Sequence, residues 1–382
     1  MTNKESPASA PEVRRGRRRK ARDSGAAKQA LAQLPWDQPR YLDPPVEPVG
    51  LEGAQRIHEA AMQILEEIGI DFLHEKARDV LAVAGCKITD SSPTVRMDRD
   101  FVMEQVNKAP DHVSLTPRNQ DRRLVFGEDL AAFGLVASPP NVSDLDNGRR
   151  VGNRKDYQNF LRLAQSFDCI HFTGGYPVEP IDIHPSIRHL DCLFDLLTMT
   201  DKLVHAYSLG VERVEDAMEM VRIAGGFSHS EFEQSPKMFT NINSTSPLKH
   251  DWPMLDGAMR LARRGQPTTV TPFTLAGAMA PITIAGAVVQ FVAEALAAIV
   301  LLQCVRPRVP CAIGSFTSNV DMRTGSPAFG TPEYMRATQI SGQMARFTAC
   351  HCVPATPAPP TFRTPRPPGR ARSRYGPRYR LA

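Results

Sequence analysis

Short apolar runs of strand character alternate with helical patterns between residues 133 and 346, about one pair for every 30–40 residues. This alternation is typical of a parallel β-sheet whose strands are connected by crossover helices, so it limits the chain to an α/β fold. The predicted strands are 133–137, 169–174, 203–207, 238–243, 268–273 and 310–316. The predicted helices are 154–167, 186–199, 212–225, 252–264, 281–304 and 331–346.

The predicted strands end in small or polar residues, such as Gly174, Ser208, Asn243 and Ser315. No glycine-rich phosphate-binding pattern follows the first strand, which disfavours a dinucleotide-binding sheet. A TIM-type (β/α)8 barrel, with its site on the loops after the strands, fits better. Only about six βα units are present, whereas a closed barrel needs eight.

The region before the barrel has helical periodicity. Ile57, Ala61 and Ile64 recur at the spacing of one helix face, and shorter helices are predicted near 75–84 and 99–108. We therefore expect an N-terminal helical cap. The predicted division of the chain is a disordered basic, Pro-rich tail (1–50), the helical cap (51–125), an incomplete βα barrel (126–347) and an Arg/Pro-rich tail (348–382).

The net charge of +5 comes from the two ends of the chain. Residues 26–347 carry 31 basic and 38 acidic residues, a net charge of −7, so we predict no nucleic-acid partner. The arginine run at 14–22 suits an RNA- or membrane-binding arm or a solvated tail, and the tail is favoured because no aromatic residue is interleaved.

The apolar run at 281–304 has the length of a membrane span, but Gln290 and Glu294 interrupt it. We predict a buried helix packed against the sheet and no membrane partner. Seven cysteines at irregular spacing, with no signal peptide, indicate a reduced, cytoplasmic protein.

Motifs for metal binding and nucleophilic catalysis are weak. The sequence has no HExxH, HxH, CxxC or GxSxG pattern, and Cys350-His351-Cys352 is its one tight Cys/His cluster. Cys169 and Cys311 lie in predicted strands, where a small buried side chain is the common role. We therefore predict no metal site and assign no catalytic residue.

Polar loops and aromatic residues after the strands supply the candidate site. Asn243 opens a polar loop, and Asp321 and Glu333 lie in the loop after the last predicted strand. The two acids suit a site or a scaffold, since Glu333 in a first helical turn is also a routine dipole partner. Aromatic residues near strand ends suit a cage for a quaternary ammonium or the barrel core; they are Phe133, Tyr176, Tyr207, Phe273 and Phe316. The predicted substrate-binding residues are Asn243, Phe273, Phe316, Asp321 and Glu333.

Four segments resemble the trimethylamine/glycine betaine:corrinoid methyltransferase family. They are Asn243-Ser-Thr-Ser-Pro-Leu248, Leu275-Ala-Gly-Ala-Met-Ala-Pro281, Ala293-Glu294-Ala-Leu296 and the segment from Asp321 to Glu333. The resemblance covers about residues 50–347. It implies an eight-stranded TIM-type barrel and transfer of a methyl group from a methylated amine to Co(I) of a corrinoid.

The resemblance also implies how the cofactor arrives. The corrinoid would be carried by a separate partner protein, so no cofactor is expected to bind this chain directly. Family members that use trimethylamine carry pyrrolysine, which this sequence does not show, and this favours a quaternary amine such as a betaine. A non-catalytic betaine-binding protein on the same barrel is the alternative; a metal-dependent barrel hydrolase is disfavoured by the missing ligand motifs. A homo-oligomer remains open.

From Thr348 the composition changes abruptly to eight prolines and seven arginines with no acid. We expect a one-base frameshift after codon 347, with a natural disordered tail as the alternative; genomic DNA across codon 348 tests this. With two barrel edges unpaired, we expect the 382-residue chain to be inactive, poorly folded and prone to self-association.

Overall fold

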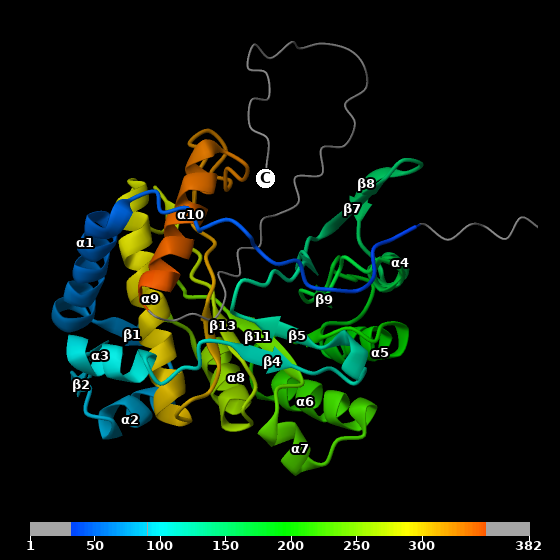
Figure 1. Cartoon of the computed structure of the whole chain (residues 1–382), viewed down its shortest axis with the longest axis horizontal. Helices are drawn as coiled ribbons and strands as arrows, with labels where there is room; N and C mark the ends of the chain where they lie inside the picture. The colour runs from blue at the N-terminus through cyan, green and yellow to red at the C-terminus, as the bar shows by residue number, and fades with distance from the viewer. Residues whose placement is uncertain (1–31, 90, 349–382) are drawn as a thin grey trace, which may run out of the picture. The chain divides into compact units, whose positions relative to one another are not determined.

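The computed structural model of the protein describes residues 32–89 and 91–348 (Figure 1). The predictions on the arginine run, the Cys350 cluster and the C-terminal tail fall outside these residues. Residues from Pro35 onward form one unit, which is the unit described below. All six predicted barrel strands are present, though shorter than expected: β6 (Gly134–Leu135), β9 (Phe172–Thr173), β10 (Val204–His205), β11 (Met238–Ile242), β13 (Thr268–Val270) and β15 (Cys311–Ile313).

The six strands are parallel and follow one another in chain order. Strands β10, β11, β13 and β15 form a four-stranded sheet, and β6 pairs with β9. A parallel bridge from Phe172 to Leu203 joins the two groups. The predicted mixed α/β class is therefore confirmed. No pairing joins β6 to β15 among the described residues, so the closed barrel stays a prediction.

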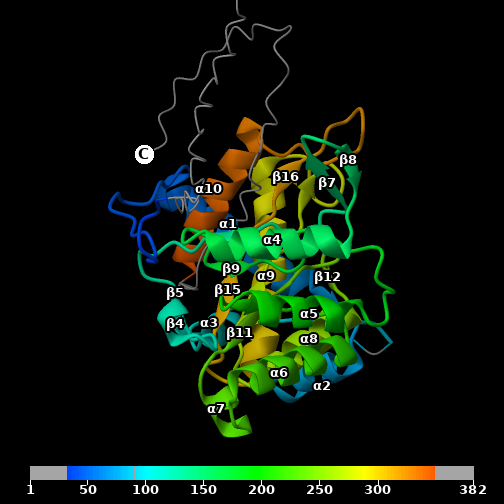
Figure 2. The ribbon, with the colours of Figure 1, turned by 90° about the vertical axis from the view of Figure 1, so that its right-hand side faces the viewer.

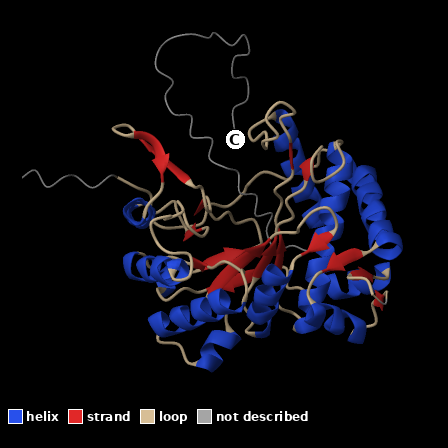
Figure 3. Cartoon of the chain, turned by 180° about the vertical axis from the view of Figure 1, so that it is seen from behind, coloured by secondary structure: helices blue, strands red, loops and turns tan. Residues whose placement is uncertain are grey.

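A helix follows every one of these strands, as predicted. The helices are α4 (Arg154–Ser166), α5 (Arg188–Met199), α6 (Val211–Gly225), α8 (Trp252–Arg263), α9 (Ile284–Val305) and α10 (Pro332–Phe347); a short helix that the sequence did not predict, α7 (His229–Gln234), precedes β11. Side chains close in the sequence cap the N-termini of α4 and α10. Asn153 and Asp156 form a capping box on α4, and Thr331 caps α10 with Pro332 in its first turn. Figure 3 shows the strands inside and the helices outside.

Helix α9 is the centre of the largest hydrophobic core. It packs against α1 (Gly50–Gln63) and α3 (Arg99–Val106), and also against β13 and β15. It is long and apolar enough to cross a membrane, but 78% of its most apolar stretch is buried inside the protein. Gln290 and Glu294 are buried as well. The prediction of a buried helix is confirmed.

The N-terminal region contains the predicted helices and also strands that the sequence analysis missed. Helix α1 continues through a π-helical turn (Ile64–Ile68), and α2 (Glu75–Val83) precedes α3. A small sheet lies among them, formed by β1 (Ile70–Phe72), β2 (Lys87–Ile88), β3 (Thr94–Arg96) and β12 (Lys249–His250). The N-terminal region is therefore not purely helical. The parallel pairing of β1 with β12 also ties the chain after β11 to this region.

A hairpin packs against the amino ends of β10 and β11. Strands β4 (Val113–Leu115) and β5 (Leu124–Phe126) pair with each other and pack apolar side chains against Leu203 and Phe239. The segment before them in the chain also contributes, because the Gln38 side chain bonds both the N–H and the C=O of Val125. The remaining short strands are β7 (Asn141–Asp144), β8 (Gly148–Val151), β14 (Leu275–Ala276) and β16 (Ser318–Asn319).

Candidate functional site

The carboxyl ends of the parallel strands are the end at which a site can form. Figure 2 shows the β7–β8 hairpin, which follows β6, and the loop before α10, which follows β15, at one end of this unit; α7 lies at the other. Sites of βα barrels lie on the loops that follow the strands, because the loops there converge on one opening. We therefore describe the side chains that follow β9, β10, β11, β13 and β15.

Tyrosines gather where β9 and β10 end. The Tyr176 and Tyr207 rings lie 4.7 Å apart, edge to face. The Tyr207 hydroxyl accepts the backbone N–H of Tyr176 at 2.9 Å and hydrogen-bonds Ser138, which follows β6. Burial raises the pKa of Tyr207 to about 12, so the phenol is neutral at physiological pH. One side chain thus links the ends of three neighbouring strands.

His205 lies on the inner face of β10, two residues before Tyr207 and on the same face of the strand. Its Nε2 accepts the backbone N–H of Asn241 at 3.1 Å, which assigns the ring proton to Nδ1. Burial lowers the pKa of His205 to about 4, so the imidazole is neutral. Its Nδ1 has no hydrogen-bond partner among the described residues, and the ring lines a cavity of about 30 Å³ that His189 also lines. That cavity has room for about one water molecule.

The predicted phenylalanines come together where β13 and β15 end. The Phe273 and Phe316 rings lie 4.8 Å apart and are half-buried. Phe329, from the loop before α10, extends this pair with its ring 5.0 Å from that of Phe316. Phe329 was missed because nothing in the sequence marks a loop residue as a neighbour of a strand end.

Asn243 lies between the two aromatic groups in strand order. It follows β11, which pairs with β10 on one side and β13 on the other, and its side chain is exposed like that of Asn241. Both asparagines lie at two-residue intervals after Phe239, on the same face of the strand, and the Phe239 ring contacts His205 at 5.0 Å, so they belong to the inner face. The arrangement is an aromatic pair, two amides and a second aromatic pair.

Glu294 fixes the loop that Asn243 opens. This carboxylate, fully buried in α9, accepts hydrogen bonds from the Ser244 hydroxyl, from the Ser246 hydroxyl at 2.6 Å and from the Leu248 N–H at 2.7 Å. The Gln290 amide donates a further bond at 2.8 Å. The sequence analysis noted Glu294 only as a break in an apolar run and as part of a family segment. Four donors on one buried carboxylate make it a positioning group for this loop.

Both predicted acids are exposed. Asp321 lies in the loop before α10 and Glu333 lies at the start of α10. Asp321 accepts the Arg323 N–H at 2.8 Å, which closes a turn. Glu333 lies in the first turn of α10, where its charge favours the helix dipole. Neither forms a hydrogen bond or an ion pair with Asn243 or contacts the Phe273 ring, so their role in substrate binding stays a prediction. Phe133 lies elsewhere: it precedes β6 and stacks on His171.

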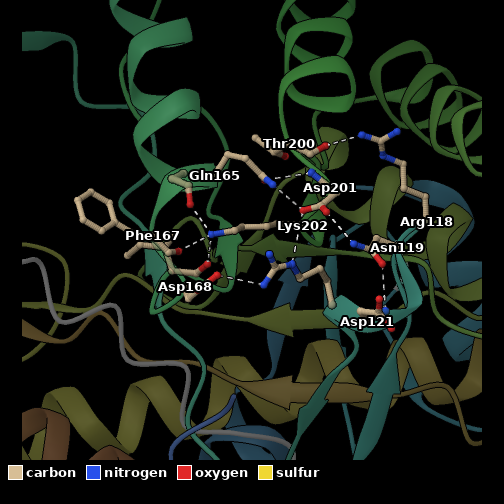
Figure 4. Close-up of polar contacts among 12 residues, drawn as sticks. Arg118, Asn119, Asp121, Gln165, Phe167, Asp168, Thr200, Asp201 and Lys202 are labelled. Carbon is tan, nitrogen blue, oxygen red and sulfur yellow. Dashed lines mark hydrogen bonds and ion pairs between the residues drawn. The ribbon is translucent and has the colours of Figure 1, made fainter. Parts of the chain in front are cut away.

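A buried lysine organises the opposite end of the strands (Figure 4). Lys202 precedes β10, and its ammonium donates to the carbonyls of Ala164, Phe167 at 2.6 Å and Ile170 at 2.5 Å. Burial lowers the pKa of Lys202 to about 8, which leaves it protonated at neutral pH. Asp201, next to it, accepts from Asn119 at 2.6 Å. All three N–H groups of the Lys202 ammonium are thus paired with carbonyls, which leaves none of them for a ligand.

No group of three or more His, Cys, Asp or Glu residues in the described ranges could hold a metal ion. The chemistry that these residues offer is that of aromatic faces, amides and hydroxyls at the carboxyl ends of the strands. Such groups bind and orient a cationic molecule, and none of them is an activated nucleophile.

Comparison with known proteins gives a consistent family. A family model for trimethylamine methyltransferase (MTTB) matches residues 14–354. The chain is 36% identical over 293 residues to the glycine betaine methyltransferase of Desulfitobacterium hafniense strain Y51, covering 77% of this chain and 60% of that protein. It is 25% identical over 305 residues to the proline betaine:corrinoid methyltransferase of Eubacterium limosum, covering 78% of this chain and 62% of that protein.

A third relative is the trimethylamine methyltransferase MttB of Desulfitobacterium hafniense strain DSM 10664 / DCB-2, 27% identical over 280 residues, or 72% of this chain and 56% of that protein. The chain thus spans about three fifths of the length of these relatives. The match to the family model over most of the chain shows that this protein belongs to the trimethylamine methyltransferase (MTTB) family.

Proposed function

We propose that this protein transfers a methyl group from a quaternary amine such as a betaine to the Co(I) corrinoid of a separate protein. The observation that carries the proposal is the 36% identity to a protein named glycine betaine methyltransferase. The aromatic and amide side chains at the carboxyl ends of the strands support it, since they suit a molecule with a cation at one end and a carboxylate at the other.

Each part of the proposed site has a role that its chemistry supports. The faces of Phe273 and Phe316 attract a quaternary ammonium, because the ring quadrupole is negative there. The amide of Asn243 can donate to the betaine carboxylate. Asp321 and Glu333 follow Phe316 in the chain and are exposed. Their negative charges would attract the cation from solvent.

The reaction demands little acid–base chemistry from this chain. The corrinoid supplies the nucleophile: cobalt donates both electrons of the new bond to the methyl carbon, and the broken C–N bond leaves its pair on nitrogen. A quaternary amine departs as a neutral tertiary amine, so no proton has to be delivered. The work left to the protein is to hold the cation in line and to exclude water. Neutral His205 and Tyr207 suit such a site because they add no charge beside the cation.

We further propose that the six strands belong to a TIM-type (β/α)8 barrel. The parallel pairing in chain order and the helix after every strand support this. The predicted domain boundaries at residues 51, 126 and 348 belong to the same proposal.

A methyl-transfer assay tests the function. The purified chain would be mixed with cob(I)alamin and glycine betaine, proline betaine, L-carnitine or trimethylamine, with the glycine betaine methyltransferase of Desulfitobacterium hafniense as positive control. The proposed function predicts amine-dependent methylation of the corrinoid, fastest with a quaternary amine, and this result would contradict the inactivity expected from the two missing βα units. If the control transfers methyl groups and this chain does not, the proposed activity is wrong for this chain.

Calorimetry on the same panel separates the alternatives. Saturable betaine binding without methyl transfer would support the non-catalytic betaine-binding protein, and it is also the result that the expected inactivity of this chain predicts. If the chain shows no betaine binding and no methyl transfer, both the enzyme and the betaine-binding protein are excluded.

A further inference from the structure

The main chain places Thr271, which follows β13, between Asn243 and Gly314. The Thr271 N–H donates to the Ile242 carbonyl at 2.7 Å, and the Gly314 N–H donates to the Val270 carbonyl at 2.8 Å. These bonds continue the parallel pairing of β11 with β13 and of β13 with β15 by one residue. Asn243, Thr271 and Gly314 are therefore direct neighbours on three adjoining strands, and we call them the polar row.

The Thr271 side chain belongs to the inner face of the sheet. Val270 packs into the core around α9, on the outer face, and side chains alternate between the two faces of an extended chain. Phe273, two residues after Thr271, contacts Phe316 with the ring centres 4.8 Å apart. Thr271 thus shares its face with this pair of phenylalanines and with Asn243. Gly314 adds no side chain to the row.

The Thr271 hydroxyl has no hydrogen-bond partner among the described residues, although Thr271 is only 5% exposed. Hydroxyls close to it are paired: Thr274 bonds Thr317 at 2.6 Å, and Ser315 bonds Ser341 at 2.9 Å. Proteins pair nearly all of their buried donors, because an unpaired one is costly. An acceptor on a ligand would remove this cost at Thr271.

A ligand has access to the polar row at Asn243. The Asn243 side chain is exposed, and its amide has no hydrogen-bond partner in the described part of the chain. Rotation about the Cα–Cβ bond of Thr271 exchanges its hydroxyl with its methyl group, so the donor can turn towards a ligand beside Asn243. The row then presents an amide N–H and a hydroxyl to one acceptor group.

We propose that Thr271 and Asn243 bind the carboxylate of a betaine, and that Thr271 makes the site select quaternary amines that carry a carboxylate. This rests on the proposed function, in which the phenylalanine pair holds the ammonium. Residues two apart on one face are about 7 Å apart along a strand. A betaine spans this distance when its carboxylate accepts hydrogen bonds from the polar row and its methyl groups meet the ring faces.

The selectivity follows from the charge of the acceptor. A hydrogen bond to a carboxylate is roughly twice as strong as one between neutral groups. Choline has the same trimethylammonium group as glycine betaine but a hydroxyl in place of the carboxylate. A site whose donors are left without a strong acceptor rejects such an analogue. The wild type should therefore bind glycine betaine more tightly than choline.

Calorimetry of the 382-residue chain with glycine betaine and with choline tests the proposal. Thr271→Val keeps the shape of the side chain and removes the donor. We expect it to raise the Kd for glycine betaine by roughly tenfold and the Kd for choline by less than about twofold. Thr271→Ser keeps the donor and should bind glycine betaine within about threefold of the wild type.

Thr268→Val is the matched control. Thr268 is buried in the same strand, and its hydroxyl also lacks a partner among the described residues, but it shares the outer face with Val270. We expect this variant to bind both ligands like the wild type. Thermal melts of all three variants check that each one is folded.

The proposal is wrong if the wild type binds choline as tightly as glycine betaine, or if Thr271→Val retains wild-type affinity for glycine betaine. It is also wrong if Thr271→Val weakens the binding of both ligands equally, or if Thr268→Val weakens betaine binding as much. Methyl transfer from glycine betaine to cob(I)alamin separates the two proposals. Transfer by the wild type together with unchanged betaine affinity in Thr271→Val overturns the carboxylate site alone, whereas a wild type that neither binds nor transfers overturns both.

Discussion

At the amino ends of the parallel strands a buried lysine and its acceptors satisfy one another, whereas at the carboxyl ends amides and apolar side chains face solvent. Lys202 makes three hydrogen bonds to carbonyls and is 2% exposed. Asn241 and Asn243, two strand positions apart, are exposed. A saturated network is rigid but has nothing left to offer a ligand. The comparison teaches that one end of the strands holds the fold together and the other is free to bind.

The two aromatic pairs show how the open end is still organised. Tyr176 and Tyr207 are joined through a hydroxyl and a backbone N–H, while Phe273 and Phe316 meet only through their rings. Glu294, which is buried in the core, holds the loop after Asn243 in place through hydrogen bonds from Ser246 and Leu248. The open end is thus preorganised without being filled, as a binding site requires.

The largest effect should come from breaking the amino end. Lys202→Met leaves the carbonyls of Ala164, Phe167 and Ile170 without a donor in a buried place, which we expect to reduce the free energy of unfolding by about 3–5 kcal/mol. Urea denaturation measures it. The exposed Lys76→Met is the control and should change stability by less than about 0.5 kcal/mol. A loss below about 1 kcal/mol would show that the network does not anchor the fold.

Acid should destabilise the protein through His205. Its folded pKa of about 4 lies below the value of about 6.5 that it has when unfolded, so the unfolded state takes up the proton first. The stabilisation is complete above pH 6.5 and is lost as the pH falls towards 4, by up to about 3 kcal/mol.

Urea midpoints of the wild type and His205→Gln at pH 7 and pH 4.5 isolate this contribution. Glutamine can still accept the Asn241 N–H but does not titrate. The half-buried His58 and the buried His171 and His250, whose pKa values are also lowered by burial, remain in both proteins. An equal loss of stability in the two proteins would contradict the assignment.

Glu294→Gln should sharpen the comparison, because it changes both stability and binding. An amide at this position presents N–H groups to the Leu248 N–H or the Ser246 hydroxyl, so one donor is left unpaired. We expect a loss of about 2 kcal/mol in unfolding free energy and weaker betaine binding by calorimetry. Glu333→Gln on the exposed first turn of α10 is the stability control. Unchanged betaine binding in a destabilised Glu294→Gln variant would limit Glu294 to the core.

The smallest effect on stability should come from the open end itself. Phe273→Leu and Phe316→Leu remove aromatic faces while they keep apolar bulk, so betaine affinity should fall by about tenfold each, or roughly 1–2 kcal/mol. The melting temperature should change little. Phe133→Leu, at the amino side of β6, should leave affinity unchanged. Equal losses in all three variants would show that the phenylalanine pair is packing and not a binding surface.

Local patterns in the sequence predicted much of the fold. The order of the six strands and their helices follows from apolar periodicity, and the start of α10 follows from Thr331 and Pro332, because both signals act within one or two turns. The burial of α9 also followed, since Gln290 and Glu294 are incompatible with lipid.

The site was predicted only in part. Phe273 and Phe316 meet as expected because the ends of parallel strands converge, which is a property of the fold class. Asp321 and Glu333 were chosen by residue type and by their position after the last predicted strand, and neither criterion separates a ligand from a turn or a helix start. Glu294 was missed because Ser246 and Leu248, which it bonds, lie far away in the chain, and Phe329 because nothing in the sequence marks a loop residue as a neighbour of a strand end.

The sequence by itself thus determined the class of fold, the order of its elements and the family, because these depend on local pattern and on short segments that resemble the family and can be read along the chain. The tertiary structure alone decided that β1 pairs with β12, that Glu294 holds the Ser244–Leu248 loop and that Lys202 caps carbonyls of α4 and the turn after it. It also decided which end of the strands is closed. These features depend on contacts between distant segments, and hydrophobic periodicity carries no information about which distant segments meet.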